Sequence, residues 1–127
     1  MSGPLILVAE DERDIRELIV FTLQIGGFDV VEVPNGEEAV KKATEVKPDL
    51  ILMDVRMPKM TGYEACQALK EQDGTKDIPI VFLSAKGQET EISKGLKLGA
   101  VKYFLKPFAP DELSAQVNEI LAKYGKI

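Results

Sequence analysis

Five side chains suited to phosphate chemistry directly follow short apolar runs: the carboxylates Glu10, Asp11 and Asp54, the hydroxyl of Ser84 and the amine of Lys106. Carboxylates packed together repel one another unless a cation offsets their charge, and an oxygen-only site of this kind suits Mg²⁺. Beside such a metal, Asp54 could attack phosphorus, while Ser84 donates a hydrogen bond and Lys106 places positive charge on the phosphoryl oxygens. These residue types predict phosphoryl transfer to an aspartate.

The pattern of the chain predicts how these side chains are brought together. Short apolar runs alternate with longer stretches of helical period, which is typical of an α/β fold with a doubly wound parallel sheet and helices on both faces. The expected strands are 5–9, 29–33, 50–53, 80–83 and 103–105. The first, third and fourth have the apolar composition of strands buried on both faces, whereas the second and fifth are more peripheral. Because ligands bind at the carboxyl ends of such strands, the five side chains should meet at one edge.

Helical spacing predicts five helices between and after these strands. The first carries apolar residues from 15 to 23 and stops at Gly26 and Gly27, and the last begins after Pro110. The others are expected over 37–46, 63–71 and 88–98. The helix over 88–98 contains Gly95, which costs about 1 kcal/mol relative to alanine, so we expect it to be the most mobile. The whole chain, 1–127, is predicted to be one domain with an ordered core of about 4–124.

Composition excludes several classes of function. The 127 residues include 16 Lys and Arg against 21 Asp and Glu, a net charge of −5 without any histidine. This acidic chain has no general attraction for nucleic acid or anionic membranes, and the apolar stretch 4–9 is too short for a signal peptide or membrane span. We therefore expect a cytoplasmic protein. With one cysteine, Cys66, and no histidine, zinc sites, histidine catalysis and an internal disulfide are excluded.

Four motifs in order closely resemble the receiver domains of bacterial two-component response regulators. They are LILVAEDE at 5–12, DVRMPKMTG at 54–62, Ser84-Ala85 and Lys106-Pro107-Phe108. No single motif is specific, but each stands at the end of a predicted strand and together they span essentially the whole chain. The resemblance implies a flavodoxin-like sheet with strand order 2-1-3-4-5, as in chemotaxis regulators.

The resemblance also implies the role of each residue in the metal site. Asp54 would be the phosphoacceptor, charged from a phosphohistidine on a sensor histidine kinase or phosphotransfer protein. Asp11 and Asp54 would ligate Mg²⁺ directly, together with the backbone carbonyl of Arg56. Glu10 would act mostly through a metal-bound water. Many receivers have aspartate at this position, so how far the longer Glu10 side chain reaches toward the metal, and its exact role, stay open. Ser84 and Lys106 match the hydroxyl and the lysine of the family.

Further residues are assigned to switching and to phosphoryl lifetime by the same resemblance. Ser84 and Tyr103 are the candidate switch, because in receivers an aromatic at this place turns inward when the hydroxyl moves toward the phosphoryl group. Arg56 and Lys86 match positions that flank this group, so they are expected to change its lifetime in a direction that the sequence leaves open. We expect a monomer or weak homodimer that acts through an effector protein.

The leading hypothesis is thus a signalling module that catalyses only its own phosphorylation and dephosphorylation. An alternative is a receiver-like module that binds partners without phosphorylation. A phosphatase of the haloacid dehalogenase kind needs an acid two residues after its nucleophile, whereas Asp11 is followed by Glu12 and Arg13. A flavodoxin-like cofactor binder is disfavoured because Glu10 and Asp11 would repel a phosphate. The cognate kinase, its signal and the output partner stay open.

Overall fold

The strands form one sheet in the computed structural model, which describes residues 3–85, 97–106 and 109–126. In chain order they are β1 (Leu5–Ala9), β2 (Asp29–Val33), β3 (Leu50–Asp54), β4 (Ile80–Ala85) and β5 (Lys102–Lys106). All neighbours pair in parallel, in the spatial order β2-β1-β3-β4-β5. The predicted strand order is confirmed, and the second and fifth strands are the edges of the sheet as expected.

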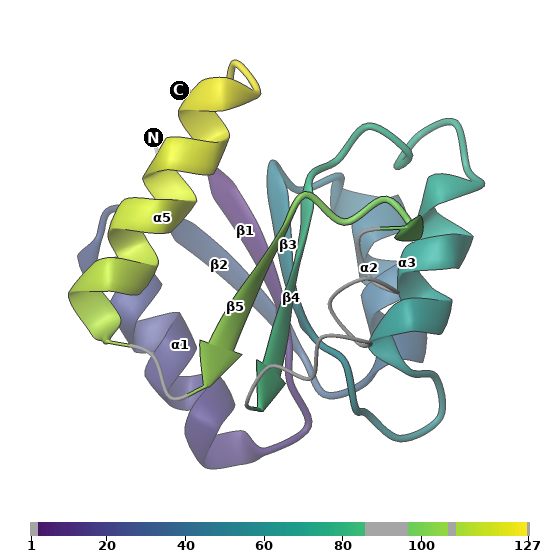
Figure 1. Ribbon diagram of the computed structural model, residues 1–127, viewed down its shortest axis with the longest axis horizontal. Coiled ribbons are helices and arrows are strands. Elements are labelled where there is room, and N and C mark those ends of the chain that lie inside the picture. The colour runs from purple at the N-terminus through teal and green to yellow at the C-terminus, as the bar shows by residue number, and fades with distance from the viewer. Residues whose placement is uncertain (1–2, 86–96, 107–108, 127) are drawn as a thin grey trace.

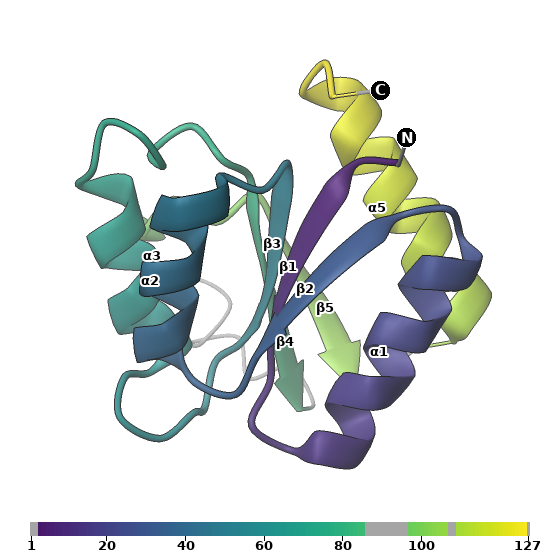
Figure 2. The same ribbon diagram turned by 180° about the vertical axis from the view of Figure 1, so that it is seen from behind.

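Helices cover both faces of this sheet (Figures 1 and 2). They are α1 (Arg13–Ile25), α2 (Gly36–Val46), α3 (Gly62–Lys70) and α5 (Pro110–Lys123). Figure 1 shows α1 and α5 on one face and α2 and α3 on the other. Among the described residues, no helix combines the length and apolar character needed to cross a bilayer. The helix predicted over 88–98 falls almost entirely outside the described residues. Its expected mobility therefore stays a prediction.

Local sequence signals explain where the helices begin and end. The Asn35 side chain accepts a hydrogen bond from the Glu38 N–H at 2.8 Å and caps α2. Thr61 and Glu64 form a reciprocal capping box at the start of α3, with bonds of 3.1 and 3.0 Å. After α1 the chain turns at Gly27, whose φ of 94° favours glycine. The two caps fix the starts of α2 and α3 relative to the strands that precede them.

The sheet separates two apolar layers because successive strand residues point to opposite faces. Toward α1 and α5 point Ile6, Val8, Leu50, Leu52, Val81 and Leu83. Toward α2 and α3 point Leu7, Ala9, Ile51, Met53, Ile80 and Phe82. All twelve are fully buried, and each large aliphatic side chain of this kind contributes about 1.5–3 kcal/mol when removed from water. The central strands are thereby held rigidly enough to position side chains at their ends.

The strands extend slightly further than the apolar runs predict. Asp54 is the last residue of β3, Ser84 lies within β4, and Lys106 is the last residue of β5. Main-chain pairing continues past the apolar residues, as in the bond from the Val55 N–H to the Leu83 carbonyl at 3.1 Å. Because this pairing does not depend on the side chain, polar residues can end a buried strand. Asp54, Ser84 and Lys106 therefore belong to the sheet, whereas Glu10 and Asp11 follow the end of β1 in the loop before α1.

Candidate functional site

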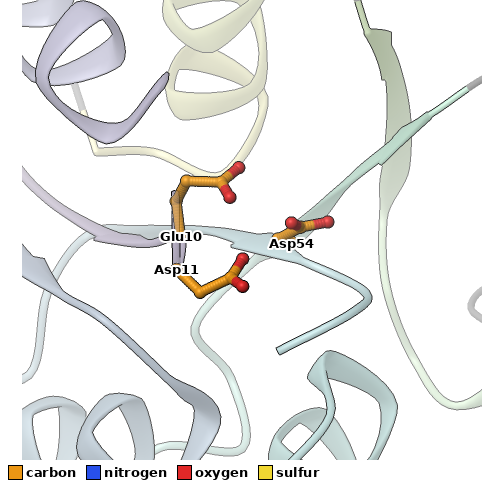
Figure 3. Close-up of side chains that lie close together, drawn as sticks. All are labelled: Glu10, Asp11 and Asp54. Carbon is orange, nitrogen blue, oxygen red and sulfur yellow. The ribbon is translucent and has the colours of Figure 1, made fainter. Parts of the chain in front are cut away.

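Three carboxylates meet at the carboxyl edge of the two central strands β1 and β3. Glu10, Asp11 and Asp54 each place a carboxylate oxygen within 4.8 Å of the others (Figure 3). Glu10 is fully buried, Asp54 is 7% exposed, and Asp11 is exposed. The sequence predicted this convergence, and the structure confirms it for all three residues.

Hydrogen bonds to the main-chain N–H and carbonyl of Glu10 hold this residue in place. Its N–H donates to the Val33 carbonyl of β2 at 3.2 Å, and its carbonyl accepts from Nη1 of Arg16 on α1 at 2.9 Å. The Glu10 carboxylate in turn accepts the Glu12 N–H at 3.2 Å. This buried acid is therefore positioned by β2, by α1 and by the loop that joins β1 to α1.

The loop after Asp54 folds back closely on the strand that it leaves. The Gly62 N–H donates to the Val55 carbonyl at 2.8 Å, and a Cβ atom at Gly62 would lie 2.3 Å from the Asp54 carbonyl oxygen. A second close approach occurs at Gly36, where a Cβ would lie 2.2 Å from the carbonyl oxygen of Met60. Both positions require glycine because no side-chain carbon fits at such a distance. Gly62 thus lets the loop after Asp54 pack against the end of β3.

The remaining predicted residues lie on neighbouring strands of the same edge. Ser84 is 3% exposed and pairs with Leu105, and Lys106 pairs with Ala85 at the end of β5. The side chain of Lys106 lies outside the described part of the structure, as does all of Lys86. Arg56 is exposed, two residues beyond Asp54. The metal contact of its carbonyl and the roles of Ser84 and Lys106 stay predictions.

Tyr103 has a partner that the sequence did not suggest. Its hydroxyl lies 2.7 Å from the hydroxyl of Tyr63 on α3. Phe82 of β4 makes edge contacts with both rings, at centroid distances of 5.2 Å to Tyr63 and 5.8 Å to Tyr103. Strand alternation places Ser84 on the same face as Phe82, so the predicted switch pair shares the face covered by α3. No sequence signal links positions 63 and 103, which are 40 residues apart.

The carboxylate oxygens at this edge of the sheet determine which ion the site can bind. Carboxylate oxygens at this spacing match the ligands preferred by a hard divalent cation such as Mg²⁺, and the acidic cluster is suited to holding one. A cation here would also offset the mutual repulsion of the three acids. Histidine and thiolate ligands play no part, since the chain has no histidine and Cys66 is buried elsewhere, on the inner side of α3.

Comparison with known proteins identifies a family whose members resemble this chain over most of its length. Residues 6–118 match the response regulator receiver domain family. The phosphate regulon transcriptional regulatory protein PhoB of Pseudomonas aeruginosa is 41% identical over 98% of this chain and 55% of its own. The alkaline phosphatase synthesis transcriptional regulatory protein PhoP of Bacillus subtilis is 45% identical over 93% of this chain and 48% of its own. The chain thus spans about half the length of these relatives.

Two solved structures match this chain over nearly their whole length. A putative response regulator from Chloroflexus aurantiacus superposes with a TM-score of 0.90 at 32% identity, covering 94% of this chain and 98% of that one. The chemotaxis response regulator CheY4 of Vibrio cholerae gives 0.88 at 32% identity, with 94% and 99% covered. This likeness extends over nearly the whole fold. The chain belongs to the response regulator receiver domain family of two-component systems.

Proposed function

We propose that Asp54 accepts a phosphoryl group, with Mg²⁺ held by Glu10, Asp11 and Asp54, and that this modification alters a partner-binding surface. The observation that carries the proposal is the convergence of three carboxylates within 4.8 Å at the end of two buried central strands. Membership of the receiver family supports phosphorylation as the purpose of this edge. The domain acts in signalling and catalyses only its own phosphorylation and dephosphorylation.

Asp54 is better placed than the other two acids to be the nucleophile. Glu10 is fully buried, and Asp11 lies on the solvent side of the cluster. Asp54 ends β3, which is hydrogen-bonded to β4, so its neighbours are the strand ends that carry Ser84 and Lys106. A nucleophile needs stabilising groups around the transferring group, and only the β3 position has these two strands on its free side.

The proposed reaction is an in-line displacement at phosphorus. A carboxylate oxygen of Asp54 forms the new O–P bond while the bond from phosphorus to the donor breaks, and the donor leaves with the electron pair. Mg²⁺, when bound, supplies positive charge that offsets the carboxylates and the phosphoryl oxygens. Ser84 donates a hydrogen bond to a phosphoryl oxygen, and the Lys106 ammonium balances its charge. The donor is a phosphohistidine on a sensor histidine kinase or phosphotransfer protein.

The output of the domain is proposed to pass through Tyr103 and Ser84. Phosphorylation draws the Ser84 hydroxyl toward Asp54, which changes the packing of Phe82 and Tyr103 on the face covered by α3. Because Tyr103 is hydrogen-bonded to Tyr63, the change would reach α3 as well. The curated relatives are named as transcriptional regulators. The proposed partner or effector of this domain is therefore one that controls transcription.

Incubation with acetyl phosphate and Mg²⁺, followed by intact-mass measurement, tests the proposal. We expect the wild type to gain one phosphoryl group only when Mg²⁺ is present, and Asp54→Asn to gain none. Asp49→Asn is the matched control, because Asp49 flanks the other end of β3 and its carboxylate accepts the Leu5 N–H at 2.8 Å. A wild type that stays unmodified at every Mg²⁺ concentration would favour a receiver-like module that works without phosphorylation.

A further inference from the structure

Arg16 connects three parts of the molecule that meet at the acidic edge. Its side chain is 17% exposed, donates from Nη1 to the Glu10 carbonyl at 2.9 Å and forms an ion pair from Nε to Glu32 of β2 at 2.9 Å. Its own backbone N–H donates to the Glu12 carbonyl at 2.9 Å in the first turn of α1. The guanidinium therefore ties α1 to β2 across the loop that carries Glu10 and Asp11.

A second arginine on the same helix shows what an ordinary surface contact looks like. Arg13 pairs with Glu17 at 3.1 Å, but their side chains are 80% and 57% exposed. Exposed pairs of this type contribute little to stability because water and salt screen them. Arg16 differs because it is mostly buried and because one of its two contacts is to the main chain of a site residue.

The bond to the Glu10 carbonyl restrains the backbone from which the Asp11 side chain departs. A peptide unit is planar, so holding the Glu10 carbonyl also fixes the N–H of Asp11 in the same plane. The preceding peptide unit is held too, since the Glu10 N–H donates to Val33. With both planes restrained, the Glu10 backbone and the start of Asp11 have little freedom to turn. The carboxylates are then pre-arranged for a cation instead of being ordered when it binds.

We propose that Arg16 is a positioning residue for the acidic site, which raises Mg²⁺ affinity by fixing the peptide between Glu10 and Asp11. This proposal rests on the proposed function of that site. The role requires arginine because the planar guanidinium reaches Glu10 and Glu32 from two different nitrogens, whereas a lysine ammonium is a point charge on a flexible stem. Residues that support metal ligands in this way typically change metal affinity by about 10- to 100-fold when they are replaced.

The test separates the two contacts of Arg16. Mg²⁺ affinity is measured by calorimetry and by the dependence of the melting temperature on Mg²⁺ for the wild type, Arg16→Lys, Glu32→Gln and Arg13→Gln. We expect Arg16→Lys to weaken Mg²⁺ binding by roughly 10-fold. Glu32→Gln, which leaves the guanidinium free to hold the Glu10 carbonyl, should change the affinity less than about 3-fold, and Arg13→Gln should not change it.

A second readout does not depend on the metal. Amide hydrogen exchange at Asp11 and Glu12 should be faster in Arg16→Lys than in the wild type without Mg²⁺, and Arg13→Gln should match the wild type. If Arg16→Lys only lowers the melting temperature, with unchanged exchange at these amides and unchanged Mg²⁺ affinity, the positioning role is wrong while the proposed function stands. If the wild type itself binds no Mg²⁺, both are wrong.

Discussion

The two ends of the parallel sheet use similar polar residues in different ways. At the amino end, three polar side chains are bonded to the main chain: Asp49 accepts the Leu5 N–H, Thr75 donates to the Leu69 carbonyl at 2.7 Å, and Lys70 donates to two carbonyls at 2.9 Å each. At the carboxyl end, Glu10, Asp11 and Asp54 gather as three like charges within 4.8 Å.

Asp49 and Asp54 show the difference on a single strand. Asp49 directly precedes β3 and Asp54 ends it, only five positions later. The first carboxylate is engaged by a backbone N–H of a neighbouring strand and serves the fold. The second lies among like charges, an arrangement that costs stability unless a cation joins it. A carboxylate grouped with like charges is therefore a better indicator of function than a buried carboxylate alone.

The largest expected effect is on stabilisation by Mg²⁺. A ligand that binds only the folded state stabilises it by about 2.7 kcal/mol at 100 times its dissociation constant. We expect the wild type and Asp49→Asn to show this rise in unfolding free energy, and Asp54→Asn to lose most of it because one of three ligands is neutralised. Thermal and urea unfolding with and without Mg²⁺ measure the effect. An equal Mg²⁺ response in the two variants would remove the contrast between the ends of β3.

A smaller effect is expected where the backbone packs against the acceptor strand. Gly62→Ala forces a Cβ to within 2.3 Å of the Asp54 carbonyl oxygen, so the loop or the strand must shift, at a cost of about 1–2 kcal/mol. Gly74→Ala near the opposite end is the control, because its Cβ would meet only the flexible Lys47 side chain at 3.4 Å. Urea unfolding of both variants checks the difference. Equal stability would mean that the loop after Asp54 is not tightly packed.

The smallest effect concerns the titration of Cys66 and Lys70 on α3. Burial raises the pKa of the Cys66 thiol to about 11 from its ordinary value of 9.0. Above pH 9 the unfolded thiol ionises while the folded thiol does not, so this group lowers stability as the pH rises toward 11. Burial lowers the pKa of Lys70, which acts in the opposite direction: the unfolded lysine keeps its proton longer, and stability rises with pH.

Replacing the thiol isolates its contribution. The free energy of unfolding of the wild type should fall relative to that of Cys66→Ala by about 1 kcal/mol between pH 8 and pH 10, measured in urea. The Mg²⁺ response should be the same in both proteins, since Cys66 lies away from the acidic edge. A pH-independent difference between them would show that the thiol is less shielded from water than its burial indicates.

Much of the fold and part of the site follow from sequence pattern alone. The apolar runs located all five strands to within two residues. The three inner strands were the most distinct, because strands buried on both faces have few alternative interpretations. The rule that parallel strands present their carboxyl ends at one edge then placed Glu10, Asp11 and Asp54 together.

Tyr63 and Arg16 were not foreseen. Their partners lie on other elements, such as Tyr103 on β5 and Glu32 on β2, and periodicity along one chain does not encode distances between elements. Two strands also extend beyond the apolar runs, to include Asp54 and Ser84. Hydropathy does not predict this extension, because main-chain pairing does not depend on the side chain.

The central claim is that the phosphoryl group is attached to Asp54, and locating it tests this most directly. After reaction with acetyl phosphate and Mg²⁺, borohydride reduces a phosphorylated aspartate to homoserine, whose position is found by mass analysis of peptides. The account predicts homoserine at position 54 and at no other aspartate, with none formed when Mg²⁺ is omitted. Homoserine at position 11 or 49, or a phosphoryl group that resists borohydride, would contradict it.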